Sequence, residues 1–291
     1  MPKSRRHGVV SIAALDVRRR PDHRAELTSQ LLVGEVVRVL GMARGGRWLK
    51  VENRADGYRG WVKDWGVVEA SQARVRRWIQ RARARVVALF VEARARPGAG
   101  PLVSPLFWNG RVIPGSTRDG YRRVELPDGR RGWVPRATLA SDRAARGAVA
   151  RGGLAARVRG LLGVPYLWGG RTPLGFDCSG FTQQVLAEQG LLIPRDADAQ
   201  FQRSQTLAHG ASPGEGDLIF FRAPGEPVGH VGLGLGGGYY AHCRRVVRVS
   251  SVDPRNELYD KELAPQFAGW KRPRKKAKPG RPAASRRGDS A

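Results

Sequence analysis

The stretch FDCSGF, residues 176–181, decides how this chain is interpreted, because it places one of only two cysteines ahead of a helical pattern. Apolar residues recur at helical spacing at Phe181, Val185 and Leu186. Cys178 is therefore predicted in the first turn of a helix. Because unsatisfied backbone N–H groups at a helix start favour an anion, we expect the pKa of its thiol to lie below that of a free cysteine. The alternative is a buried cysteine that packs as a small hydrophobic residue.

Residues 229–243 hold two of the five histidines and are predicted to form a β-hairpin. Apolar residues flank the triple glycine at 236–238, which suits a tight turn. If the arms pair about Gly237, His230 and His242 lie on one face as diagonal neighbours. A thiolate nucleophile needs a base and a group that orients the base. The two histidines are candidates for these roles, although each taken singly is as well explained by a structural role.

These segments resemble the NlpC/P60 family of papain-like cysteine peptidases, which cut peptides of the bacterial cell wall. The resemblance covers about residues 154–270 and rests on YLWGG at 166–170, GFDCSGF at 175–181, IPRD at 193–196, GDLIFF at 216–221 and GHVGL at 229–233. It implies that Cys178 is the nucleophile, His230 the base and His242 the residue that orients the base. The thiolate would attack an amide carbonyl and His230 would protonate the leaving amine. The backbone N–H of Cys178 is the first candidate donor to the oxyanion.

The resemblance also implies residues that bind the substrate. In members that require a free N-terminal L-alanine, the residues equivalent to Ser179 and Asp196 bind the ammonium group, and a carboxylate suits a desolvated cation. Both residues could instead cap helices. Tyr166 is expected in the substrate pocket near the oxyanion, with a place in an aromatic core as its alternative. Asp177 and Tyr58 complete the candidate substrate-binding residues.

The amino-terminal half contains an internal repeat, GYRGWV at 57–62 and GRRGWV at 129–134, which indicates a duplicated small domain. Short apolar runs separated by glycine turns predict a small β-barrel in each copy. Both copies resemble bacterial SH3-like domains, and the second departs more from the usual opening. We expect Trp61 and Trp133, at matched positions, to be buried. Tyr58 has no aromatic counterpart in the second copy and is expected to reach the catalytic cleft.

The repeat and the resemblance together imply an α+β protein, in which two small SH3-like β-barrels precede a papain-like NlpC/P60 catalytic domain. The predicted boundaries are 1–70 for the first SH3-like domain, 71–85 for a basic, helical linker, 86–142 for the second SH3-like domain, 143–270 for the catalytic domain and 271–291 for a basic, disordered tail. Each domain is large enough to bury a core of its own.

The formal net charge of +27 suggests contact with anions, because lysine and arginine displace counterions from phosphates whatever the sequence. No nucleic-acid-binding motif accompanies the charge. We therefore expect no specific nucleic acid, and only non-specific contact with polyanions through the tail. A monomer without a cofactor or a metal is expected.

The apolar run at residues 9–15 is too short for an export signal, and no apolar stretch is long enough to cross a membrane. Two cysteines provide no disulfide framework. These features predict cytoplasmic residence, with export as the alternative if the start codon is misassigned.

The function implied by the resemblance is hydrolysis of the γ-D-glutamyl–diamino acid bond in cell-wall-derived peptides that carry a free N-terminal L-alanine. In the cytoplasm this activity would serve the recycling of murein peptides. Two alternatives are an exported hydrolase that acts on the intact wall and a non-catalytic protein that binds the wall or another polyanion. A third is a zinc hydrolase with Cys178, His230 and His242 as ligands, since these residue types also suit zinc.

Overall fold

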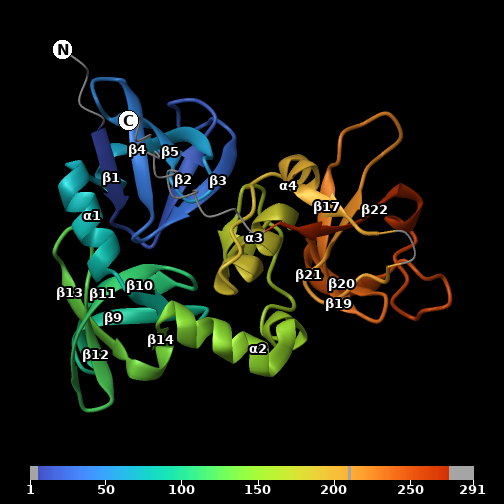
Figure 1. Cartoon of the computed structure of the whole chain (residues 1–291). Coiled ribbons are helices and arrows are strands. Elements are labelled where there is room, and N and C mark those ends of the chain that lie inside the picture. The colour runs from blue at the N-terminus through green and yellow to red at the C-terminus, as the bar shows by residue number, and fades with distance from the viewer. Residues whose placement is uncertain (1–5, 209–210, 275–291) are drawn as a thin grey trace, which may run out of the picture.

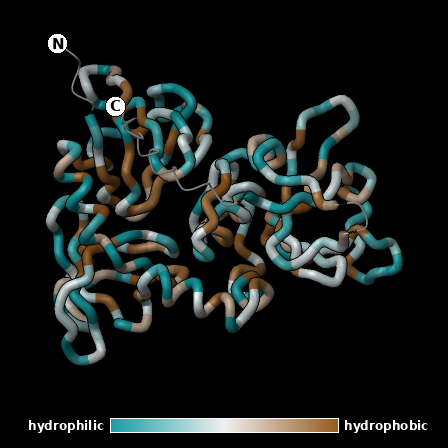
Figure 2. Tube along the Cα trace, in the orientation of Figure 1, coloured by the Kyte–Doolittle hydropathy of each residue, from teal (hydrophilic) through white to brown (hydrophobic). Residues whose placement is uncertain are grey.

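The computed structural model describes residues 6–208 and 211–274. Two β-barrels lie on one side and a mixed domain of helices and one sheet lies on the other (Figure 1). The predicted α+β fold, with two small barrels ahead of a mixed domain, is confirmed. Apolar stretches run through the strands of each unit, and hydrophilic residues lie mainly on the outer loops (Figure 2).

The first barrel is a seven-stranded sheet in the order β3-β2-β6-β5-β4-β1-β7. Its strands are β1 Arg6–Val10, β2 Ala14–Arg18, β3 Leu27–Leu32, β4 Val36–Ala43, β5 Trp48–Asn53, β6 Arg59–Lys63 and β7 Val67–Ala70, with the 3₁₀ turn η1 Asp64–Gly66 before β7. Alternate residues point inward, as the period of two requires. Leu15, Val17 and Val62 belong to the core that results.

The second barrel repeats this topology strand for strand, in the order β10-β9-β13-β12-β11-β8-β14. Its strands are β8 Ala84–Val86, β9 Phe90–Arg96, β10 Ala99–Phe107, β11 Arg111–Arg118, β12 Tyr121–Glu125, β13 Arg131–Pro135 and β14 Leu139–Ala140, and the 3₁₀ turn η2 Arg136–Thr138 occupies the place of η1. The duplication read from the two GWV motifs therefore extends over the whole barrel.

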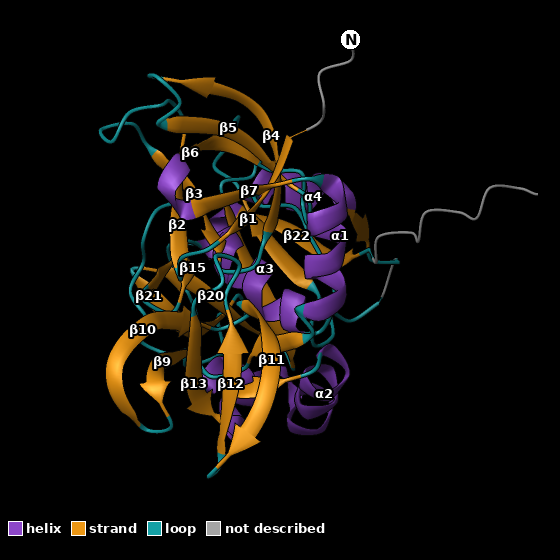
Figure 3. Ribbon diagram, turned by 90° about the vertical axis from the view of Figure 1, so that its left-hand side faces the viewer, coloured by secondary structure: helices purple, strands orange, loops and turns teal. Residues whose placement is uncertain are grey.

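Each barrel is followed by a helix that a serine caps. Helix α1, Gln72–Arg81, begins after Ser71, and helix α2, Asp142–Arg159, begins after Ser141. Each serine side chain accepts a hydrogen bond from the third backbone N–H of its helix, at 3.3 Å and 3.2 Å. Helix α1 packs against both barrels, which are stacked one above the other in Figure 3.

The mixed domain contains a six-stranded sheet in the order β17-β22-β18-β19-β20-β21. Its strands are β17 Ser204–Thr206, β18 Leu218–Phe221, β19 His230–Gly236, β20 Tyr239–Arg244, β21 Val246–Ser251 and β22 Phe267–Pro273. The remaining elements are β15 Arg171–Thr172, β16 Gly175–Phe176, α3 Cys178–Glu188, α4 Ala197–Arg203 and the 3₁₀ turn η3 Ala264–Gln266. Helix α3 packs against β19 and β20, so the start of α3 lies beside the hairpin that carries the histidines.

The second barrel supplies a side chain to the core of the mixed domain. Trp108 follows β10, is 1% exposed and belongs to the same apolar cluster as Leu154 and Phe181. The Arg157 guanidinium of α2 lies over the Trp108 ring, 5.0 Å from its centroid. Next to it, the Asn109 side chain donates to the Gln184 carbonyl of α3 at 3.0 Å. The second barrel is therefore packed directly against the mixed domain.

Three sequence-based expectations need correction. Trp61 and Trp133 are only half-buried, because their strands point the adjacent glycine and valine inward and turn each tryptophan away from the core. The linker helix ends at Arg81 and β8 begins at Ala84, so the second barrel starts before residue 86. Strand β22 continues to Pro273, within the segment expected to be a disordered tail. The rest of that segment, residues 275–291, lies outside the described residues.

Within the described ranges, no helix is both long and apolar enough to cross a membrane.

Candidate active site

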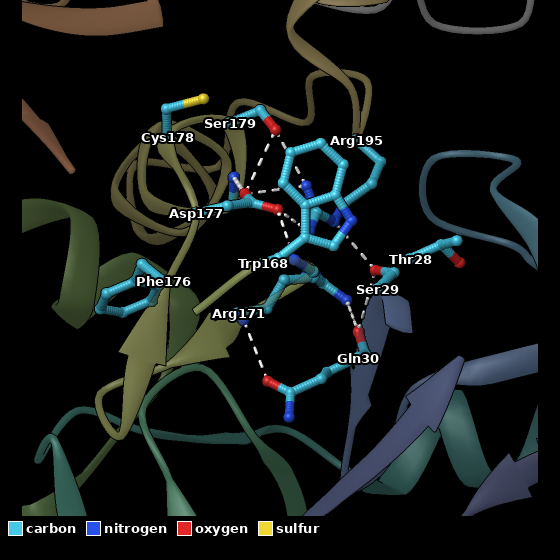
Figure 4. A network of polar contacts seen from close by, with 12 residues as sticks. Thr28, Ser29, Gln30, Trp168, Arg171, Phe176, Asp177, Cys178, Ser179 and Arg195 are labelled. Atoms are coloured by element: carbon cyan, nitrogen blue, oxygen red, sulfur yellow. Dashed lines mark hydrogen bonds and ion pairs between the residues drawn. The ribbon is translucent and has the colours of Figure 1, made fainter. Parts of the chain in front are cut away.

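Cys178 is the first residue of α3, as the sequence predicts. Asp177 occupies the N-cap position with extended backbone, and its Oδ1 accepts the Gly180 N–H at 2.6 Å. Helix capping at this site is thus carried out by Asp177 and not by Ser179. The Cys178 side chain turns away from Asp177 (Figure 4) and is 7% exposed.

The histidine hairpin has the predicted register. Leu233 pairs with Ala241, which corresponds to pairing about Gly237, and Gly236, Gly237 and Gly238 all have positive φ in the turn. His230 and His242 meet as expected, with Nε2 of the first 2.8 Å from Nδ1 of the second.

The thiol of Cys178 lies against the backbone on both sides of His230. Its Sγ is 4.0 Å from the Gly229 carbonyl oxygen. Burial raises the pKa of this thiol to about 12, and the nearby Asp177 charge acts in the same direction. Hydrogen bonds from the backbone N–H groups of Val231 and Ser179 lower the pKa but do not offset burial. The expected depression of the thiol pKa is therefore wrong for this structure, because the helix-start effect is outweighed by desolvation.

Both histidines are neutral at physiological pH. Burial lowers the pKa of His230 to about 4, and the positive charge of Arg244 contributes. Burial also lowers the pKa of His242 to about 2, helped by the neighbouring His230. In the resting state Cys178 is therefore a thiol and His230 a neutral imidazole.

A cleft of about 270 Å³ lies between the first barrel and the mixed domain, beside Cys178. Six of the eight candidate residues line it: Tyr58, Tyr166, Asp177, Cys178, Ser179 and Asp196. Neither histidine is among the lining residues: His230 directly follows the lining residue Gly229, and His242 lies behind His230, in contact with its ring. The structure thus brings residues from the first barrel, α3, α4 and the sheet to one place.

Arg195, which sequence reasoning did not select, organises the floor of this cleft. Its guanidinium is 1% exposed and forms two hydrogen bonds to Asp177, with Nη1 3.0 Å from Oδ1 and Nη2 2.5 Å from Oδ2. It also donates to Ser179 Oγ at 2.9 Å and, across the domain boundary, to Ser29 Oγ of β3 at 2.9 Å (Figure 4). Asp177 and Ser179 line the cleft, but their polar atoms are already engaged by Arg195.

Asp196 and Tyr58 face each other across the boundary between the first barrel and α4. Asp196 holds the N-cap position of α4, yet its side chain makes no capping hydrogen bond. The neighbouring Tyr58 hydroxyl donates to the Thr28 carbonyl at 3.4 Å. Burial raises the pKa of Asp196, and the Arg195 charge opposes the rise. Burial also raises the pKa of Tyr58. The alternative role of Asp196 as a helix cap is therefore wrong for its side chain.

Tyr166 stands at the opposite wall and is 36% exposed, so it is not an aromatic core residue. Burial of its hydroxyl, followed by the proximity of Cys178, raises the pKa of Tyr166. The phenol therefore stays protonated and can donate a hydrogen bond near the sulfur.

The first barrel contributes further groups that the sequence did not reveal. Glu26 accepts from the indole N–H of Trp168 at 2.9 Å and forms an ion pair with Arg19 at 2.6 Å. All three residues line the cleft. No local motif surrounds Arg19 or Glu26, whereas Trp168 lies within YLWGG and could have been selected from it.

The barrel is fixed against the mixed domain by close backbone approach and by Arg171. Gly169 has a φ of +76°, and a Cβ there would meet the Leu27 carbonyl oxygen at 2.6 Å. Arg171 donates to the Gln30 carbonyl at 2.5 Å and pairs with Glu35 at 3.0 Å. These contacts hold β3 at the edge of the cleft.

The geometry does not support the zinc alternative. The ring nitrogens of His230 and His242 face each other at hydrogen-bond distance, so they cannot both point at one ion together with Cys178. Across residues 6–208 and 211–274, no group of three or more histidine, cysteine, aspartate or glutamate side chains is arranged to hold a metal ion.

Comparison with known proteins agrees with this architecture. Residues 163–266 match the NlpC/P60 family, and residues 17–65 match the bacterial dipeptidyl-peptidase Sh3 domain. The chain contains an NlpC/P60 domain. The two matched segments place the α3 helix, the histidine hairpin and the cleft-lining loops in the NlpC/P60 domain, and Tyr58 and Glu26 in the SH3 domain.

Two curated relatives are γ-D-glutamyl-L-lysine dipeptidyl-peptidases. The protein from Bacillus cereus is 34% identical over 46% of this chain and 41% of its own length, and that from Bacillus subtilis is 41% identical over 35% of each chain. The aligned regions thus span less than half of these relatives. A crystal structure of an NlpC/P60 family protein from Bacillus cereus shares the fold, with a TM-score of 0.75, 22% identity, and coverage of 91% of this chain and 99% of the other.

Proposed function

We propose that this protein is a cysteine endopeptidase that hydrolyses the γ-D-glutamyl–diamino acid bond of cell-wall-derived peptides with a free N-terminal L-alanine. The observation that carries the proposal is that Cys178 Sγ lies 4.0 Å from the carbonyl oxygen of Gly229, the residue before His230, while His230 contacts His242, and that Cys178 and Asp196 line the same cleft. The similarity to γ-D-glutamyl-L-lysine dipeptidyl-peptidases supports the same bond specificity.

The chemistry follows from the protonation states. Cys178 begins as a thiol and His230 as a neutral imidazole, so His230 takes the thiol proton as the sulfur attacks the substrate carbonyl. The resulting imidazolium then protonates the leaving amine of the diamino acid. The Cys178 backbone N–H and the Tyr166 hydroxyl are the donors we assign to the oxyanion.

The charges in the cleft favour a cationic end group on the substrate. Asp177 is paired with Arg195 and Glu26 with Arg19. Asp196 and Asp198 both line the cleft without an ion pair in the described part of the chain. Asp198 accepts a hydrogen bond from Gln202 at 2.7 Å, and we assign the ammonium group to Asp196. A buried carboxylate and a desolvated ammonium stabilise one another, which selects peptides with a free amino terminus.

The first barrel forms part of the cleft wall, since Tyr58, Thr28 and Glu26 line it together with Asp196. A glycan strand attached to the alanine nitrogen would have to pass through this wall. The arrangement therefore favours free peptides over the intact wall, as recycling of murein peptides requires.

The test uses mass analysis of products from L-Ala-γ-D-Glu-diaminopimelate and L-Ala-γ-D-Glu-L-Lys, from their N-acetylated forms and from intact sacculi. We expect cleavage of the free peptides, no cleavage of sacculi and loss of turnover in Cys178→Ser with an unchanged fold. Asp196→Asn should raise KM for free peptides, whereas the matched variant Asp198→Asn, at another cleft carboxylate, should not. Cleavage of sacculi without cleavage of free peptides would refute the proposal, as would full turnover by Cys178→Ser.

A further inference from the structure

His242 makes contacts on both ring nitrogens and is fully buried. Its Nδ1 faces His230, and its Nε2 has two polar neighbours from β21: Ser250 Oγ at 3.1 Å and Arg248 Nε at 3.2 Å. The two neighbours differ in what they allow. An arginine can only donate, so Arg248 requires an unprotonated Nε2, whereas the Ser250 hydroxyl can donate to an unprotonated Nε2 or accept from a protonated one, and is thus the neighbour that can serve the Nε2–H tautomer.

Arg248 is held in place by Asp260, which lies on the loop after β21. The guanidinium Nη2 is 2.5 Å from Asp260 Oδ2, and that oxygen is itself 3.9 Å from His242 Nε2. The other carboxylate oxygen accepts the backbone N–H groups of Glu262 and Leu263, each at 3.1 Å. Asp260 is therefore a fixed, buried anion that anchors Arg248 beside the histidine pair.

The partner of His242 Nε2 determines where the protons of the pair lie. When Arg248 donates to this nitrogen, a neutral His242 carries its proton on Nδ1 and donates it to His230 Nε2. A neutral His230 then has its proton on Nδ1, the nitrogen left for Cys178, and cannot accept the thiol proton there. When Nε2–H of His242 donates to Ser250, both tautomers are reversed and His230 Nδ1 is free. The two arrangements contain the same number of protons.

We propose that Arg248 and Ser250 are positioning residues that compete for Nε2 of His242 and so set the tautomer of the His230–His242 pair. The inference rests on the proposed function in taking Cys178 and His230 as the reacting pair. The Arg248 side chain is 39% exposed and reaches His242 only through Nε, so this hydrogen bond can break while Nη2 keeps its ion pair with Asp260. While Arg248 donates to Nε2 of His242, the pair is in the tautomer in which Nδ1 of His230 is protonated and cannot act as a base. When this hydrogen bond is broken, Ser250 and Asp260 favour the tautomer in which Nδ1 of His230 is free.

A matched control is available in Arg244, at the end of β20. It carries the same charge, lies 4.0 Å from Asp260 and, like Arg248, lowers the pKa of both histidines, but it is paired with Glu262 and donates nothing to His242. The charged groups that face the pair are Arg244, Arg248 and Asp260, with Asp177 on the side of His230. Replacing either arginine by methionine removes one positive charge near the histidine pair. Only the replacement of Arg248 also removes a hydrogen bond to His242.

The test is ring-¹⁵N NMR of the full chain, in which five histidines are labelled and His242 is assigned with His242→Gln. We expect the Nδ1–H tautomer of His242 in the unaltered protein and in Ser250→Ala, and the Nε2–H tautomer in Arg248→Met. Arg244→Met should keep the original tautomer. An unchanged tautomer in Arg248→Met, or an equal shift in Arg244→Met, would overturn the proposal.

A kinetic measurement separates this inference from the proposed function. Arg248→Met should speed alkylation of Cys178 by iodoacetamide at neutral pH by about fivefold relative to Arg244→Met, the equivalent of one hydrogen bond, and Ser250→Ala should slow it. Equal rates in the two arginine variants would contradict the competition. If Arg248→Met shifts the tautomer but the protein cleaves no wall peptide, only the proposed function is refuted. If the protein cleaves the peptides but Arg248→Met shifts no tautomer, only this inference is refuted.

Discussion

Arg195 lies against Asp177 in a two-pronged ion pair, with Nη1 3.0 Å from Oδ1 and Nη2 2.5 Å from Oδ2. Because Asp177 caps α3, this pair fixes the helix start from which Cys178 projects. The same guanidinium donates to Ser29 of the first barrel. One buried cation therefore joins the helix that begins at Cys178 to the neighbouring domain.

Replacement of Arg195 by methionine should be strongly destabilising. It would leave the Asp177 charge buried and unpaired, at a cost of about 3–5 kcal/mol in the free energy of unfolding, measured by urea denaturation. Arg255→Met is the control, since its ion pair with Asp253 is exposed and its loss should leave the free energy of unfolding nearly unchanged. Equal losses in the two variants would contradict the role given to Arg195.

Trp108→Ala should destabilise the NlpC/P60 domain although the residue lies in the second barrel. The change would leave a cavity beside Leu154 and Phe181 and remove the ring over which Arg157 lies, at a cost of about 3–5 kcal/mol. Trp65→Ala, at an exposed site, should change stability by less than about 0.5 kcal/mol. Hydrogen exchange of α2 and α3 would report the effect, and protection unchanged in both helices would argue against a shared core.

The rate of Cys178 alkylation should keep rising with pH. With burial holding the thiol pKa at about 12, the thiolate fraction increases by about tenfold per pH unit between pH 6 and 9. Iodoacetamide kinetics would measure this, with Cys178→Ala to show that the buried Cys243 does not react. A plateau between pH 5 and 7 would instead reveal a resting thiolate–imidazolium pair.

The protein should lose stability in mild acid partly through His242. Its pKa falls from about 6.5 in an unfolded chain to about 2 in the fold, so between these values the unfolded state binds more protons. The stabilisation is complete above about pH 6.5 and declines as the pH falls toward 2, at up to about 1.4 kcal/mol per pH unit for this group. His242→Asn should therefore flatten the dependence of unfolding free energy on pH between 6 and 4. An identical slope in the variant would mean that His242 is not held neutral.

Much of the fold follows from local pattern. The GWV repeat predicts the duplicated barrels, and the triple glycine fixes the hairpin register that joins His230 to His242. Such features depend on turn chemistry and on a side-chain period of two, both of which operate within a few residues. The outward orientation of Trp61 was not predicted, because the choice of inward face in a short strand depends on which neighbours fill the barrel.

The groups that complete the site are the ones that sequence could not supply. Glu26 reaches Trp168 across 142 positions, and Arg195 reaches Ser29 across 166. No spacing rule connects residues so far apart. The sign of the shift in the thiol pKa of Cys178 was missed for the same reason, since burial arises from the packed domains and not from the helix start alone.

The serine-capped helices that follow the two barrels pack against different parts of the molecule. Helix α1 stays with the repeat and bridges the two copies, whereas α2 places Val149, Leu154 and Val158 in the core of the NlpC/P60 domain. The helix that follows the second barrel, α2, is thus part of the hydrophobic core of the NlpC/P60 domain. A change that loosens this helix should therefore destabilise the second barrel and the core around Cys178 together.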